Sequence, residues 1–222
     1  MKTLYIDTSS SYLYSAIVND ETIIAEVKEE LGHTLSEKAL PKIVNLFTTS
    51  NLVAKDIDRI VVVDGPGSFT GIRIGITIAK VYAWSLNIPI VPISALEAMA
   101  ISTETSELKV PLLDARRNYV YAAIYNKDNK VLMAPAHIEL EKLKEILKDN
   151  LQNKNLEDSS EYIVITNDEI ETMPGKRCAY DPDIAKIVKE TLIKPAINPH
   201  AVNPNYLKLT EAEESKLNDN HN

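Results

Sequence analysis

A repeat within the chain constrains its fold more than any other sequence feature. The stretch DTSSSYLYSAIV, starting at Asp7, aligns without a gap with DARRNYVYAAIY, starting at Asp114. The identical pairs are Asp7 and Asp114, Tyr12 and Tyr119, Tyr14 and Tyr121, Ala16 and Ala123, and Ile17 and Ile124. A similar order of strands and helices follows each copy. We therefore expect an α/β protein made of two duplicated lobes that enclose a cleft.

The first half shows the order βββαβαβ. The runs TLYID, YLYSAIV and TIIAEV predict a three-strand meander, and RIVVVD and IPIVPI predict two further strands. Two helices are expected, near 34–47 and 72–86. Thr34 and Glu37 have the spacing of a capping box, whereas Pro41 bends the first helix or moves its start toward Ser36.

The second half repeats this plan in reduced form. VLMA predicts a third strand, IELEKLKEILKDN an amphipathic helix, YIVIT a strand and DIAKIVKETLI another helix. The polar run STETSE, at 102–107, predicts the boundary, so we expect one lobe at 1–103 and the other at 104–222. After Pro195 the periodicity is lost, and ESKLNDNHN is typical of a frayed tail.

The segment VDGPGSFTGIRIG holds four of the six glycines of the chain at a predicted strand-to-helix turn. It is not a Walker loop, because no lysine follows Gly71, and Thr70 stands where a dinucleotide fingerprint needs glycine. Two interpretations remain. The turn is a structural corner in which Ser68 or Thr70 caps the helix, or its free N–H groups accept an anion such as phosphate.

The helix after this turn carries its smallest residues at intervals of four. Gly71, Gly75, Ala79 and Ala83 form one stripe, which allows another backbone to approach closely. That backbone belongs either to the protein's own sheet or preceding helix, or to a partner subunit. Arg73 opposes the helix dipole in the first turn, so we expect it to pair with a carboxylate, an anion or a partner.

Composition limits the kinds of function. The net charge of −8 argues against unaided binding of nucleic acid. The single Cys178 excludes an internal disulfide and fits a reducing compartment. No apolar stretch reaches spanning length and the start MKTLYIDTSS has no apolar secretion region, which predicts a cytoplasmic protein without membrane contact. The four histidines have no metal-ligand spacing, so we expect no metal.

Several of these segments resemble the TsaB (YeaZ) family of the actin-like ATPase superfamily. The resemblance rests on IDTSSSYLYSAIV, GPGSFTGIRIG, IPIVPISALEAMA, DARRNYVYAAIY and VNPNYLKLTEAE, and is weakest at 139–193. It implies two ribonuclease-H-like, actin-like lobes. It also implies a role in forming threonylcarbamoyl-adenosine at position 37 of tRNAs that read codons beginning with A.

In that family the member of this type is non-catalytic. The resemblance implies that it binds a TsaD-type paralogue, which performs the transfer, that a TsaE-type ATPase docks on the pair, and that the chain alone forms a homodimer. Transfer RNA is then reached only through the complex. The transferase holds a metal with a His-x-x-x-His pair, whereas His33 is followed four positions later by Glu37.

The resemblance places the partner surface on the two helices of the first lobe. The residues carried over are Leu35, Ala39, Ile43, Phe47, Gly71, Ile72, Arg73, Gly75, Ile76, Ala79, Tyr82 and Ala83. We expect no cofactor of the chain's own, because its second half is poor in the glycines a nucleotide pocket needs. Asp7 and Asp114 stand where kinases of the superfamily hold metal-linked phosphates, but without glycine turns we expect them to brace their hairpins by accepting N–H bonds. Asp7, Ser68 and Thr70 remain possible contacts for an anion or nucleotide, and ATP or ADP at the junction with the paralogue stays open.

Two other functions compete with this one. The chain could be a stand-alone enzyme, either a kinase of the same superfamily or a glycoprotease-like metallopeptidase, although the missing metal histidines oppose the latter. It could also bind tRNA directly, which the acidic composition opposes.

Overall fold

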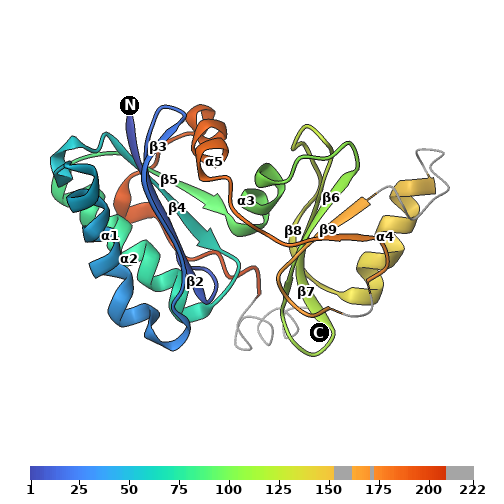
Figure 1. Ribbon diagram of the computed structural model, residues 1–222. Coiled ribbons are helices and arrows are strands. Elements are labelled where there is room, and N and C mark those ends of the chain that lie inside the picture. Colours follow the sequence, from blue (N-terminus) through green and yellow to red (C-terminus); the bar gives the residue numbers. More distant parts are fainter. Residues whose placement is uncertain (153–161, 171–172, 209–222) are drawn as a thin grey trace, which may run out of the picture.

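The computed structural model describes residues 1–152, 162–170 and 173–208, and Figure 1 shows two lobes side by side. Each lobe is built on a five-stranded mixed sheet. The first lobe contains β1 (Lys2–Asp7), β2 (Tyr12–Asn19), β3 (Thr22–Glu30), α1 (Leu35–Ser50), β4 (Arg59–Gly65), α2 (Phe69–Leu86), β5 (Ile90–Ser94) and α3 (Ala95–Ser102). The second contains β6 (Leu108–Asp114), β7 (Tyr119–Tyr125), β8 (Val131–Glu139), α4 (Leu140–Gln152), β9 (Tyr162–Ile165) and β10 (Lys176–Cys178), and α5 (Ile184–Glu190) follows.

The two sheets have the same topology, which confirms the predicted duplication. The first has the order β3-β2-β1-β4-β5 and the second the order β10-β9-β6-β7-β8, which is the equivalent order read backwards. In each, the first strand pairs antiparallel with the second and parallel with the fourth. The predicted α/β class with two duplicated lobes is therefore confirmed, and the first lobe has the full order βββαβαβ. The second lobe is reduced, as predicted, since the described residues between β9 and β10 form no helix.

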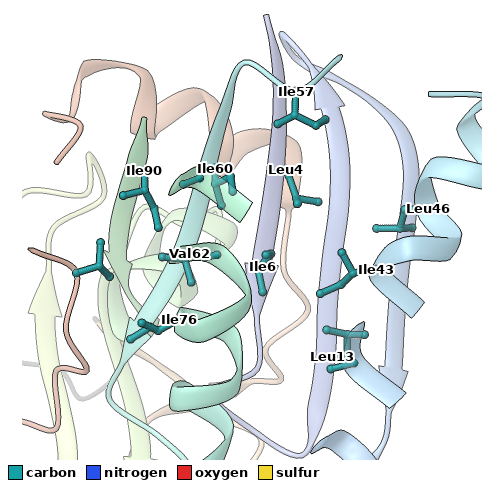
Figure 2. Close-up of a cluster of buried hydrophobic side chains, with 14 of the residues drawn as sticks. Leu4, Ile6, Leu13, Ile43, Leu46, Ile57, Ile60, Val62, Ile76 and Ile90 are labelled. Atoms are coloured by element: carbon teal, nitrogen blue, oxygen red, sulfur yellow. The ribbon is translucent and has the colours of Figure 1, made fainter. Parts of the chain in front are cut away.

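The sheet of the first lobe is covered on both faces (Figure 1). Ile60 and Val62 of β4 pack toward α1 and α2, whereas Val61 and Val63 pack toward α3 and α5. Figure 2 shows the first of these clusters, with the aliphatic side chains of the sheet and of both helices interdigitated. Fully burying one such side chain is worth about 2 kcal/mol, so this lobe has two separate sources of stability.

The last described part of the chain returns to the first lobe. Ile184, Ile187 and Val188 of α5 belong to the cluster formed by Tyr5 and the outer face of β4. Helix α5 was expected within the second lobe. It lies instead on the first, because its apolar side chains match the uncovered face of that sheet. The two lobes are therefore not simply the two halves of the chain.

Helix α1 differs from its prediction at its first turn. Thr34 makes no side-chain cap, because its hydroxyl donates to the Leu31 carbonyl at 2.8 Å. The helix begins at Leu35 and runs through Pro41 without ending. The expected tail at 214–222 lies outside the described residues, whereas the segment after Pro195 is packed on the first lobe up to Tyr206.

Candidate partner-binding face and inter-lobe cleft

The glycine-rich turn is a packed corner. Ser68 caps α2 by accepting a hydrogen bond from the Gly71 N–H at 3.2 Å, as the sequence predicted for Ser68 or Thr70. A Cβ at Gly67 would overlap the Ser9 carbonyl, and one at Gly71 would overlap the Thr8 carbonyl. The Thr8 hydroxyl donates to the Gly71 carbonyl at 2.7 Å. The glycines therefore allow α2 to lie directly against the β1–β2 turn.

Asp7, at the end of β1, forms hydrogen bonds within the β1–β2 turn. Its side chain accepts hydrogen bonds from the Ser9 N–H at 2.8 Å and the Ser9 hydroxyl at 2.7 Å, and the residue is only 2% exposed. Burial raises the pKa of Asp7, and the bonds from Ser9 oppose that shift. The N–H of Tyr12 donates to the Ser10 hydroxyl. Two amide donors of the turn are thus engaged internally.

The second hairpin turn is built in the same way. Asp114 accepts a hydrogen bond from the Arg116 N–H at 2.8 Å, and the Asp114 N–H donates to Asp168 at 2.7 Å. Arg116, Arg117 and Asn118 have positive φ angles of 69°, 53° and 65°, a left-handed conformation that costs side-chain-bearing residues energy. The turn projects arginine side chains where a nucleotide-binding turn would need glycine.

The two turns border a cleft of about 1480 Å³ between the lobes. Ser10, Thr70, Asp114 and Arg116 are among the residues that line it. Asp7 is not, because its carboxylate is bonded to Ser9 below the surface. Gly67 and Gly71 also line the cleft, whereas the buried Asp7 is not placed to contact a ligand there. Of the predicted anion contacts, Thr70 is exposed to the cleft, whereas Ser68 acts as a helix cap.

Tyr14 and Lys28 of the first lobe line the cleft and contact the segment after β10. The rings of Tyr14 and Tyr180 pack edge to face, with centroids 5.9 Å apart, and Lys28 forms an ion pair with Asp181 at 2.8 Å. The hydroxyls of Tyr5 and Tyr180 are buried beside Asp7 without a hydrogen bond of standard geometry among the described residues. Burial raises the pKa of both tyrosines strongly, so they are neutral groups.

Most of the residues predicted to face a partner are buried in the first lobe's own core. These are Leu35, Ala39, Ile43, Gly71, Ile72, Gly75, Ile76, Ala79 and Ala83. A Cβ at Gly75 would meet the Thr8 side chain. The small-residue stripe therefore packs on the protein's own sheet, and assigning these nine side chains to a partner surface was wrong.

Both helices nevertheless present other apolar side chains to solvent. On α1, Leu40 is 52% and Val44 54% exposed, and on α2, Val81 is 60% and Trp84 65% exposed. Their exposure is unusual for large apolar groups grouped on two neighbouring helices. Whether this face binds a partner stays a prediction.

The other three predicted interface residues are not fully buried. Phe47 of α1 and Tyr82 of α2 stack at 5.8 Å between the two helices, and the Tyr82 hydroxyl donates to the Ala54 carbonyl. Arg73 has no carboxylate partner among the described residues. Its Nε donates to the Tyr206 hydroxyl at 2.6 Å, and its guanidinium lies 3.8 Å from the ring centroid of Phe69.

The sequence analysis missed a carboxylate at the end of β4. One carboxylate oxygen of Asp64 is buried without a hydrogen-bond partner among the described residues. Burial raises the pKa of Asp64 to about 7, Lys194 lowers it and Glu97 raises it. Nothing in the sequence indicated this environment, because Asp64 belongs to the glycine-rich segment and its neighbour Lys194 lies 130 positions further on.

Residues 1–152, 162–170 and 173–208 contain no group of three or more histidine, cysteine or acidic side chains placed to hold a metal ion. None of their helices is long and apolar enough to cross a bilayer. Cys178 is a free, partly buried thiol.

The two related five-stranded sheets, the helices packed on them and the cleft between the lobes define a two-lobed α/β protein. Among solved structures, an uncharacterized protein from Pseudomonas aeruginosa with similarity to peptidase YeaZ has a TM-score of 0.74 at 20% identity, over 93% of this chain and 99% of that one. YeaZ from Pseudomonas aeruginosa has a TM-score of 0.71.

Comparison with curated sequences assigns the family. The tRNA threonylcarbamoyladenosine biosynthesis protein TsaB of Bacillus subtilis is 35% identical over 96% of both chains. TsaB of Escherichia coli is 32% identical over 68% of this chain and 67% of its own. A family profile described as TsaD, tRNA N6-adenosine threonylcarbamoyltransferase, matches residues 23–212. The chain belongs to the TsaB family and is a homologue of proteins of threonylcarbamoyl-adenosine biosynthesis.

Proposed function

We propose that this chain is a non-catalytic subunit of the complex that transfers threonylcarbamoyl to N6 of adenosine 37 in tRNAs reading codons that begin with A. In this proposal it binds and activates a TsaD-type transferase through α1 and α2, and a TsaE-type ATPase docks on the pair. The observation that carries the proposal is that these two helices expose several large apolar side chains, among them Leu40, Val44, Val81 and Trp84. Such a face is typical of a protein-binding surface.

The polar groups of the two hairpin turns at the cleft bond to one another, which supports a role without catalysis. Asp7 is bonded to Ser9, and the two hairpin turns engage amide donors with their own side chains. His33 lies at the start of α1 with Glu37, and not a second histidine, four positions further on. We also propose that ATP or ADP binds at the junction between this chain and the transferase.

A reconstitution tests the proposal. The chain is mixed with the TsaD-family transferase and TsaE-family ATPase of the same genome, a threonylcarbamoyl-adenylate synthase, ATP, threonine, bicarbonate and an unmodified tRNA transcript. We expect the modified nucleoside, measured by mass spectrometry, only when this chain is present. Equal product without the chain would contradict the proposal.

A matched pair of variants locates the surface. We expect Leu40→Glu with Val44→Glu on α1 to abolish binding to the transferase, because two carboxylates are buried in an apolar contact. Val131→Glu with Leu132→Glu, also exposed apolar residues but on the second lobe, serves as the control. Equal loss of binding in both variants would contradict the assignment of the face.

One finding favours a second candidate, namely that the chain itself is a transferase. The TsaD profile matches residues 23–212. This candidate predicts modified nucleoside when the chain alone is given tRNA and threonylcarbamoyl-adenylate, whereas our proposal predicts none. Hydrolysis of ATP or of a peptide by the pure chain would instead support the kinase or peptidase alternatives.

A further inference from the structure

A groove of about 720 Å³ runs along the exposed side of α2. Arg73, Thr77, Lys80, Val81 and Trp84 of the helix form one wall. The opposite wall is a segment far away in sequence, at 199–206, which includes a short 3-10 helix, Pro199–Ala201. The groove is therefore a composite of α2 and the C-terminal segment.

Several contacts hold that segment in place. The Lys80 ammonium donates to the Val202 carbonyl at 2.9 Å and to the His200 carbonyl at 3.3 Å. Val202 itself is buried in the core of the first lobe. Further on, the Tyr206 ring stacks on Phe69 with centroids 5.0 Å apart and its hydroxyl accepts from Arg73. Both walls are thus formed before any ligand binds, which reduces the entropy cost of binding.

The charge of the groove is opposite to that of the whole chain. The protein has 32 acidic and 24 basic residues, but neither α2 nor 199–206 contains an aspartate or glutamate. The charged residues that line the groove are Arg73 and Lys80, both of them basic. Arg73 uses only its Nε in a hydrogen bond within the described part of the chain, so its two terminal nitrogens are available to a carboxylate.

We propose that this groove receives a helix of the transferase partner, which inserts an apolar side chain beside Trp84 and places a carboxylate on Arg73. The proposal rests on the proposed function and adds that the C-terminal segment forms half of the docking site. An acidic, apolar helix is the occupant because the groove combines exposed Trp84 and Val81 with cations and no carboxylate. Val81 and Trp84 are also among the exposed apolar side chains of α1 and α2, so the groove includes part of the proposed partner surface.

The first test measures affinity by calorimetry between the full chain and the transferase of the same genome. We expect Trp84→Ala and Arg73→Glu each to raise Kd at least tenfold, because a central aromatic anchor and a buried charge contact dominate such interfaces. Matched controls are Ile193→Ala, which truncates another exposed apolar side chain, and Lys127→Glu, which reverses another exposed charge. Both should leave Kd within twofold, and circular dichroism melts check that all variants fold.

The second test uses Trp84 as the only tryptophan of the chain. Incorporation of 5-fluorotryptophan into this chain gives one fluorine resonance, which we expect to shift and broaden when unlabelled transferase is added. Tyr206→Phe keeps the ring but removes the acceptor of the Arg73 bond, and we expect a smaller, two- to fivefold, rise of Kd.

The outcomes separate this inference from the proposed function. If the wild-type chain does not bind the transferase, the proposed function fails. If it binds, but the groove variants bind equally well and the fluorine resonance does not move, the groove inference is overturned while the proposed function stands. If Trp84→Ala weakens only self-association, measured by sedimentation, the occupant is a second copy and the inference is overturned as well.

Discussion

The two lobes share one sheet topology but differ in how they are stabilised. The first sheet carries α1 and α2 on one face and α3 and α5 on the other, whereas the second packs on α4 and, across the lobe boundary, on α3. The first lobe also takes α5 and the segment up to Tyr206 from the end of the chain. A duplicated plan therefore does not imply duplicated stability, because the C-terminal elements are added to one copy only.

The largest expected difference concerns glycines at close contacts. We expect Gly75→Leu to destabilise the protein by more than about 3 kcal/mol, since the new side chain must enter the space of Thr8 in a closed core. Gly175→Ala in the second lobe meets only the ring of Tyr162 and should cost less, about 2 kcal/mol including its φ of 105°. Urea denaturation of both variants measures the difference, and equal losses would contradict the comparison.

Among the described residues, each lobe has a buried cation that connects a strand to a helix. Arg59 of β4 donates to the Val188 and Thr191 carbonyls at the end of α5, both at 3.2 Å. Lys109 of β6 donates to the Ala100 carbonyl at the end of α3 at 3.0 Å.

We expect Arg59→Met to lower the free energy of unfolding by about 3 kcal/mol, because the buried carbonyls lose a charged hydrogen-bond donor. Lys109→Met should cost about 2 kcal/mol, since it removes fewer hydrogen bonds. Thermal denaturation at one pH compares the two variants, and a larger loss for Lys109→Met would refute the ranking.

Two aspartates close to the ends of equivalent strands differ in their hydrogen bonds, because Asp168 accepts one from the Asp114 N–H whereas one oxygen of Asp64 has none among the described residues. Asp64 follows the buried part of β4, and its pKa is raised to about 7, so the folded state favours the protonated acid. The destabilisation caused by ionising Asp64 in the folded protein is absent below its unfolded pKa near 4. It grows as pH rises and is complete above pH 7. We expect Asp64→Asn to stabilise the protein by about 2 kcal/mol more at pH 8 than at pH 5.

Asp168, after β9, is the control for this prediction. It accepts a hydrogen bond from the Asp114 N–H at 2.7 Å, so Asp168→Asn should not stabilise the protein at pH 8. Chemical denaturation at both pH values tests the pair. A wild-type chain whose stability is constant from pH 5 to pH 8 would be inconsistent with the burial of Asp64.

The smallest effect is expected at the hairpin turns. Arg117 is exposed and has a φ of 53°, whereas no residue from Ser9 to Ser11 in the equivalent turn has a positive φ. Arg117→Gly should stabilise the second lobe by about 0.5 kcal/mol, because relief of left-handed strain exceeds the added entropy of the unfolded chain. Ser10→Gly, the matched change in the first turn, should destabilise. A thermal shift of the same sign in both variants would contradict this.

Local patterns predicted the architecture well. The alternation of strands, the buried run of β4 and the repeat at Asp7 and Asp114 depend on neighbouring residues, so the duplicated sheets and the Ser68 cap could be predicted. The failures are long-range. The stripe from Gly71 to Ala83 was recognised as a close-contact surface, but sequence alone could not say whether Thr8 or a partner would approach it.

The periodicity of apolar residues and the repeat of one strand-helix plan were enough to determine a two-lobed α/β protein, because they act through the backbone geometry of each segment. The family was indicated separately, by the resemblance of motifs such as GPGSFTGIRIG. Tertiary packing alone decided which side of α2 is exposed, where α5 lies, and that Arg73 meets Tyr206 across 133 positions. These outcomes depend on which of several distant apolar segments packs on the same sheet, and a short stretch of sequence does not determine that choice.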